Sequence, residues 1–118
     1  MQIRDAITTF SQSEKIKAGL IWVSQTLNML QGLNGIEKKG AEKVVSLMIQ
    51  MIGQEAKLAK SVSGDDLWDE IAPFFEKALL MINSGVCEEA TLDLSKALSK
   101  VTNIGQKSMT ALREEGLI

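Results

Sequence analysis

The sequence contains no histidine and no tyrosine. Histidine is the commonest general base near neutral pH and the commonest protein ligand of transition metals, so its absence leaves carboxylates, lysines and one thiol for catalysis. It also excludes the Glu-x-x-His motif with which ferritin-like helical bundles hold metal ions. We therefore expect a protein that is not an enzyme and that uses no metal and no other cofactor.

Cysteine is nearly absent as well, because Cys87 is the single example. It has no second cysteine in the chain with which to form a disulfide, and no histidine to activate it as a nucleophile. We therefore interpret Cys87 as a small, semi-buried structural residue.

Long hydrophobic runs are missing. The longest, "LIWV" at 20–23 and "ALLMI" at 78–82, fall far short of the roughly 20 residues that cross a bilayer. The N-terminal "MQIRDAITTF" lacks the apolar stretch of a secretory signal peptide. We expect a cytoplasmic protein with no membrane span.

Proline and aromatic residues are scarce, with one proline and 4% aromatic residues in a chain that is 45% hydrophobic. Aliphatic side chains and six methionines must therefore form the core. Apolar residues recur every three or four positions, which indicates helices rather than strands. The length of 118 residues suits one hydrophobic core, so we predict a single all-α domain over residues 1–118.

A short N-terminal helix is predicted by apolar residues at helical spacing: Ile3, Ala6, Ile7 and Phe10. Continuing the same phase meets polar residues, so the stripe breaks near Ser11. There the sequence "SQSE" offers a capping box, with Ser11 as the N-cap and Glu14 three positions later. We therefore expect a new helix to begin at Ser11.

Four longer helices are predicted at about residues 11–30, 36–62, 65–83 and 88–115. The first carries a clear apolar stripe of Ile16, Leu20, Val23, Leu27 and Leu30. The connections between the helices are short and contain Gly, Asn and Ser, so consecutive helices should be antiparallel neighbours. We predict an up-down-up-down antiparallel four-helix bundle made of two helical hairpins and preceded by the short N-terminal helix.

The second of these helices has two apolar stripes. The first consists of Ala41, Val45, Met48, Ile52, Ala59 and Val62. The second, beside it, consists of Val44, Leu47, Met51 and Leu58. We therefore expect this helix to be covered on two sides.

A short internal similarity links the two halves, because Ile52-Gly53-Gln54 recurs as Ile104-Gly105-Gln106. Three matching residues leave open whether the chain arose by duplication, since any bundle repeats its apolar period. Glycine is unfavourable inside a helix, so Gly53 and Gly105 indicate places where helices approach closely.

The stretch "SGDDLWDEIAPFF" at 63–75 carries a cluster of four acids: Asp65, Asp66, Asp69 and Glu70. The free amides and positive dipole end of a helix N-terminus favour such a cluster, with Ser63 or Asp65 as the N-cap. Trp68 should lie at the rim of the core with its N–H in water. Pro73 should kink the helix or make residues 65–72 a separate opening turn.

Two functional alternatives remain for these acids. They could bind Ca²⁺ or Mg²⁺, although "DDLWDE" does not match the spacing of calcium-binding loops. They could also act as an acid and base pair of a carboxylate-based enzyme, through Asp66, Asp69 or Glu70. A helix start explains the cluster more simply than either.

Charge is unevenly divided, because the chain is basic through Val62 and acidic from Ser63 onward. We favour the interpretation that oppositely charged helices lie side by side. A sharper hypothesis is an anion-binding patch on the second long helix, formed by Lys38, Lys39, Lys43, Lys57 and Lys60. Nucleic acid is an unlikely partner, because the pI is about 5.2 and no base-stacking aromatic residues accompany these lysines.

More apolar residues are present than a four-helix core requires. The surplus gives the following interface candidates: Phe10, Trp22, Val44, Leu47, Met48, Met51, Trp68, Phe74 and Phe75. They are buried internally or they contact another chain. Our leading hypothesis is a helical protein that acts through protein association, as a homodimer or as an adaptor or chaperone whose groove accepts an amphipathic helix.

Export by a bacterial secretion system is a further alternative. Small helical proteins handled by such systems resemble this chain in being poor in aromatic residues and cysteine. However, "GLIW" and "LWDE" lack the W-x-G turn of one such family.

Overall fold

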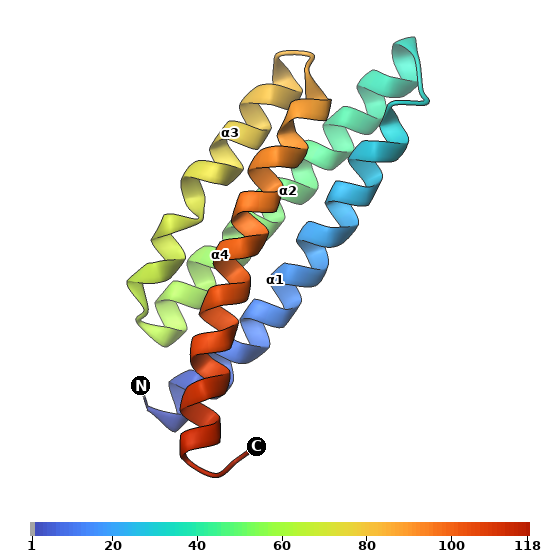
Figure 1. Cartoon of the computed structure of the whole chain (residues 1–118). Coiled ribbons are helices and arrows are strands. Elements are labelled where there is room, and N and C mark those ends of the chain that lie inside the picture. Colours follow the sequence, from blue (N-terminus) through green and yellow to red (C-terminus); the bar gives the residue numbers. More distant parts are fainter. Residues whose placement is uncertain (1) are drawn as a thin grey trace.

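The computed structural model describes residues 2–118, and all regular structure in this range is helical. Four long helices and one short 3₁₀ segment follow one another as α1 (Ile3–Leu30), α2 (Gly35–Ser63), η1 (Asp66–Glu70), α3 (Ala72–Asn83) and α4 (Cys87–Glu114). The long helices lie side by side with their axes along the same direction, and both termini lie at one end (Figure 1). The result is an elongated helical bundle measuring 54 × 22 × 17 Å.

The helices contact one another unequally. α1 packs along both α2 and α4, and α3 packs along α4, whereas the contact between α2 and α3 is much smaller. Figure 1 shows α3 next to α4, with η1 leading from α2 into α3. The bundle is therefore tightly closed around α1 and α4 and more open between α2 and α3.

The predicted break at Ser11 is wrong, because α1 is continuous from Ile3 to Leu30. The buried stripe of α1 passes through small and polar residues before it reaches the large aliphatic ones: Ala6, Thr9, Ser13, Ile16 and Leu20. Ser13 is buried, and its hydroxyl donates to the Phe10 carbonyl at 2.8 Å. Ser11 is exposed and does not cap a helix, since the stripe continues through Ser13 instead of stopping.

Close packing between α1 and α4 explains why Ser13 lies inside. A Cβ atom added at Gly105 of α4 would lie only 2.7 Å from the Ser13 hydroxyl oxygen. The expected close approach at Gly105 is therefore confirmed. At Gly53 of α2 an added Cβ would make ordinary contact with Phe75, at 3.7 Å, so Gly53 does not mark a close approach between helices.

α2 matches its predicted extent to within one residue at each end. It ends at Gly64, which adopts the left-handed conformation (φ 69°) and donates its N–H to the Lys60 carbonyl at 2.7 Å. Val45, Ile49 and Ala59 are completely buried. The expectation that α2 is covered on two sides is wrong, because the second stripe is exposed to solvent.

η1 and α3 confirm the second of the two alternatives for Pro73. The opening turn is a separate 3₁₀ segment, and α3 begins at Ala72, so Pro73 falls in its first turn, where a missing N–H is tolerated. Ile71, between the two segments, is completely buried, whereas Leu67 is exposed.

Trp68 does not lie at the rim as predicted. Its side chain is 2% exposed, and its Nε1 has no hydrogen-bond partner among residues 2–118. η1 contacts both α2 and α4, and the Trp68 side chain forms part of the floor of the groove between α2 and α3. The sequence pattern alone did not reveal this position.

Candidate functional site

A row of large apolar side chains is exposed on α1 and α2. Its members are about half exposed or more: Ile7 (53%), Trp22 (65%), Val44 (57%), Met51 (64%), Leu58 (51%) and Val62 (48%). We call this set the α1–α2 apolar face. Isolated apolar residues are normal on a protein surface, but a contiguous row along two adjacent helices is typical of an interaction site.

The α2 part of the face follows from residue spacing. Val44, Met51 and Leu58 lie seven residues apart, and Val62 follows four residues later. Steps of seven and four residues return to one side of a helix, so these side chains form a single row. The buried Val45 and Ile49 face the core, which turns the row outward.

Contacts with α1 join the two parts of the face. Ile7 and Ser11 of α1 line a shallow groove together with Leu58 and Val62 of α2. A second groove, one or two turns further along, is lined by Lys15 and Gly19 of α1 and by Met51 and Ile52 of α2. Trp22 lies one helical turn beyond Gly19 on α1, so it extends the same side of the hairpin.

Gly19 brings the two helices together at the centre of the face. A Cβ added there would lie 3.2 Å from the Ile52 side chain. Next to it, Lys15 forms an ion pair with Glu55 at 3.1 Å, and the Gln12 amide donates to Glu55 at 3.3 Å. The hydrogen bond from Lys15, followed by that from Gln12, lowers the pKa of Glu55. The face therefore has a small polar centre in which each group has a partner.

The structure separates the nine predicted interface residues into four groups. Trp22, Val44 and Met51 belong to the α1–α2 apolar face. Phe10, Met48 and Phe74 are half-buried, whereas Trp68 and Phe75 are buried in the core and are not available to a partner. Leu47 is exposed but lies on the α3 side of α2, where it lines a groove with Ile82 and Asn83.

Three residues of the face were absent from the predicted interface: Ile7, Leu58 and Val62. Leu58 and Val62 had been placed in covered stripes, and Ile7 in a short helix of its own. The seven-residue step from Val44 through Met51 to Leu58 is the signal in the sequence that could have identified this row. Its exposure depends on how α1 and α3 pack, which the pattern does not specify.

The five lysines of the proposed anion patch do not form one cluster. Lys39 and Lys43 line the groove beside Glu42, near the end of α3. Lys57 lies about four turns away, beside the acidic side chains of Asp69 and Glu76. Lys38 is half-buried, near Cys87, and Lys60 is paired with acids of η1.

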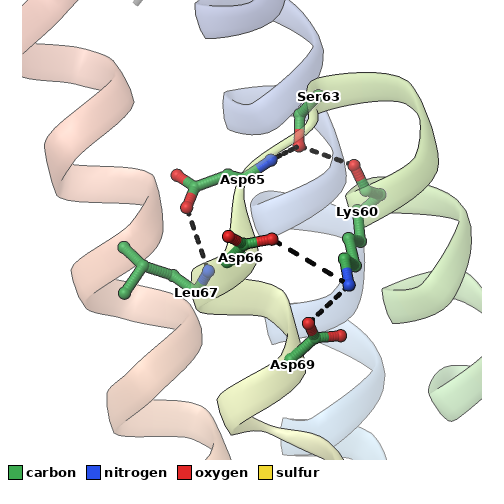
Figure 2. Close-up of polar contacts among 7 residues, drawn as sticks. Lys60, Ser63, Asp65, Asp66, Leu67 and Asp69 are labelled. Atoms are coloured by element: carbon green, nitrogen blue, oxygen red, sulfur yellow. Dashed lines mark hydrogen bonds and ion pairs between the residues drawn. The ribbon is translucent and has the colours of Figure 1, made fainter.

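The acidic cluster begins η1, as the helix-start interpretation predicted. The Asp65 carboxylate accepts a hydrogen bond from the Leu67 N–H at 3.0 Å, and the Asp65 N–H donates to the Ser63 hydroxyl at 3.4 Å (Figure 2). Asp65, not Ser63, is therefore the N-cap. A second oxygen of Asp65 accepts from Lys107 of α4 at 3.3 Å, which ties the segment to the bundle.

The other acids point to different lysines. The Lys60 ammonium lies between Asp66 and Asp69, and its hydrogen bond to Asp69 raises the pKa of Lys60 (Figure 2). Glu70 pairs with Lys100 of α4 at 3.5 Å. Among residues 2–118 no group of three or more carboxylate or thiol side chains is placed to hold a metal ion. The cluster thus consists of a helix cap and ion pairs that connect η1 to α2 and α4.

A deeper groove lies where α2 and α3 separate. Its volume is about 320 Å³, and its floor is apolar, with Ile49, Ala56, Trp68, Phe75 and Leu79. Gln50, Gln54, Lys57, Asp69 and Glu76 form a polar rim. The titratable side chains of this rim are exposed, and the groove offers mainly apolar contact.

Cys87 is completely buried at the start of α4 and thus more buried than the sequence suggested. Burial, followed by the nearby negative charge of Glu42, raises the pKa of the Cys87 thiol. Both effects disfavour the thiolate, which is the reactive form.

No protein-family model matches the sequence, and comparison with curated proteins and with solved structures finds no significant relative. None of the helices formed by residues 2–118 combines the length and the apolar character that crossing a membrane requires.

Proposed function

We propose that this protein acts through self-association, as a cytoplasmic homodimer joined by the α1–α2 apolar face. The proposal includes an up-down-up-down antiparallel bundle, in which the two helices of the first hairpin present one continuous surface. The observation that carries it is the row of six large apolar side chains that residues 2–118 leave uncovered.

The exposed area of the face suits a dimer. From their exposed fractions, these six side chains present on the order of 600 Å² to solvent, compared with the roughly 800 Å² that each partner buries in a standard stable interface. The stem of Lys15 at the centre of the face, and polar side chains around it, supply the remaining area. A second copy of the chain always presents the same apolar area, so a two-fold dimer covers both faces at once.

A charged substitution in the face tests this proposal. Met51→Glu would bury a carboxylate at the centre of the dimer interface, which is unfavourable unless the charge is paired. We expect the variant to sediment as a monomer, at concentrations where the unsubstituted chain sediments as a dimer, with an unchanged circular dichroism spectrum. Sedimentation velocity measures both species directly.

Leu92→Glu on α4 is the matched control, because Leu92 is equally exposed (63%) but lies outside the face. It should leave the dimer intact. Dissociation by both substitutions, or by neither, would contradict the assignment of the interface to the α1–α2 apolar face.

Binding of an amphipathic helix in the groove between α2 and α3 is the second candidate function. The apolar floor of this groove, from Ile49 to Leu79, favours it. Because Leu79 lies outside the α1–α2 apolar face, Leu79→Glu would impair this function and leave a dimer unchanged. Anion binding through Lys39 and Lys43, which line one groove, is a third candidate. Salt-sensitive retention on heparin, lost in the double Lys→Gln variant, would support it.

A further inference from the structure

We infer that the second copy docks with its α2 antiparallel to α2 of the first, with Met51 on the two-fold axis. This inference rests on the proposed self-association, and it adds the identity and register of the groups that meet. It comes from the spacing of residues on the face, because exposed apolar residues of α2 lie at equal distances before and after Met51.

Residues of α2 are matched in pairs around Met51. A two-fold axis that reverses the direction of α2 brings together residues at equal distances before and after the axis. Val44 and Leu58 lie seven residues to either side of Met51, so Val44 meets the partner's Leu58 and Leu58 meets the partner's Val44. Met51 meets the partner's Met51, and these pairs are all apolar.

Gly40 and Val62 form the next pair, eleven residues to either side of Met51. Eleven residues are close to three helical turns, so both positions stay on the same side of α2. No atom of the chain lies within 4 Å of a Cβ built on Gly40. This open position gives the partner's exposed Val62 a place to pack.

The same axis also matches residues of α1. Gly19 faces Ile52 and Gln12 contacts Glu55, so the level of Met51 falls between residues 16 and 20 of α1, and the axis crosses α1 near residue 18. Ile7 and Met29, which is 77% exposed, are equally distant from this point, as are Lys15 and Trp22 to within one residue. Ile7 therefore meets the partner's Met29, and the partner's Lys15 lies against the exposed Trp22 ring, where an ammonium group is attracted to the indole face.

A two-fold axis parallel to the helices would give a poorer match. It would place α2 over the partner's α1 at the same height. The contacts of Gln12 with Glu55 and of Gly19 with Ile52 put Thr26 near the level of Val44 and Gln12 near that of Leu58. Val44 would then face a polar side chain of the partner, and Leu58 would face the mixed polar and apolar groove that contains Ile7 and Gln12. The antiparallel α2 pair instead places Val44, Met51 and Leu58 against apolar groups of the partner.

Cysteine cross-linking tests this register, because a disulfide forms only where Cα atoms come within about 4.4–6.8 Å. Met51→Cys should form a covalent dimer under mild oxidation, at least tenfold faster than Leu92→Cys. Val44→Cys and Leu58→Cys should each remain uncross-linked alone and should cross-link when the two variants are mixed. The unsubstituted chain is the background control, since its single cysteine, Cys87, is buried.

The outcomes separate this inference from the proposed function. Light scattering on each reduced variant establishes that it is still dimeric. In one outcome, the dimer forms, a mixture of Val44→Cys with Thr26→Cys cross-links, and a mixture of Val44→Cys with Leu58→Cys does not. This outcome would overturn the register and leave self-association standing. A monomeric unsubstituted chain would overturn both. Rapid cross-linking of Met51→Cys together with the mixed 44/58 pair supports both.

Discussion

At the scale of single residues, the two glycines of the repeated Ile-Gly-Gln sequence have different environments. Gly105 is buried, and its backbone approaches Ser13 so closely that an added methyl group would overlap the hydroxyl. Ser13 has little freedom to move, because it is buried and bonded to the Phe10 carbonyl. Gly53 has room for a methyl group beside Phe75.

We therefore predict opposite effects for the same substitution at these two positions. Gly105→Ala should lower the free energy of unfolding by about 1–3 kcal/mol, because it overpacks the contact between α1 and α4. Gly53→Ala should raise it by up to about 1 kcal/mol, because alanine favours the helix and meets no overlap. Urea denaturation of both variants measures the difference, and equal effects would contradict the close approach at Gly105.

Asp65 and Asp66 form a second informative pair. Asp65 accepts from the Leu67 N–H and from Lys107, and its side chain is only 11% exposed. Asp66 is 92% exposed, and its nearest partner, Lys60, lies 4.0 Å away. Adjacent residues of the same type thus have very different roles.

Asp65→Ala should cost about 0.5–2 kcal/mol of stability, which is the usual effect of removing an N-cap. Asp66→Ala should change stability by less than about 0.5 kcal/mol, as is usual for an exposed site. Thermal unfolding followed by circular dichroism compares the two. If the carboxylates instead acted together as a cation site, added Ca²⁺ or Mg²⁺ would raise the melting temperature, and either substitution would remove that rise.

At the scale of helices, the sequence predicted extents better than environments. The bounds of α2 and α4 follow from the glycines after each helix and from regular apolar spacing. The continuity of α1 was missed because Thr9 and Ser13 are polar yet buried, and Gly105 of α4 leaves room for Ser13. The partner helix, not the local sequence, decides such positions.

The candidate face was predictable only in part. Met51 and Val44 were recognised because they lie outside the first stripe of α2. Whether that second stripe is covered depends on the positions of α1 and α3. The burial of Trp68 also depends on how the helices pack, but here packing buries a side chain that was expected at the rim. The Trp68 indole lies in the core, in a segment that contacts both α2 and α4.

The contact between α1 and α2 should weaken in acid. Since the pKa of Glu55 is lowered in the folded chain, the ionised Glu55 contributes stability above its unfolded pKa, near 4.5. That contribution is lost as the pH falls through the lower, folded pKa. An exposed pair such as Lys15 and Glu55 contributes about 0.2–1 kcal/mol.

Glu55→Gln tests this prediction, because glutamine does not ionise. The variant should melt at a lower temperature than the unsubstituted chain at pH 7, and the gap should close at about pH 3. Differential scanning calorimetry across this range provides the measurement. A gap that stays constant with pH would show that ionised Glu55 does not stabilise the contact.

At the scale of the whole molecule, the bundle has two open regions of different character. The α1–α2 apolar face is exposed, has only shallow grooves and contains a small paired polar centre, as suits a second copy of the chain. The groove between α2 and α3 is concave and has a polar rim, as suits a smaller ligand segment. Both follow from one feature of the fold, the tight packing of α1 and α4, which leaves the outer sides of α2 uncovered.

The molar mass in solution tests self-association most directly. Size exclusion coupled to light scattering should give twice the 12.9 kDa mass of one chain, and the value should persist on dilution into the low micromolar range. A mass of 12.9 kDa at all concentrations would contradict the account, because the α1–α2 apolar face would then remain exposed without a second copy to cover it.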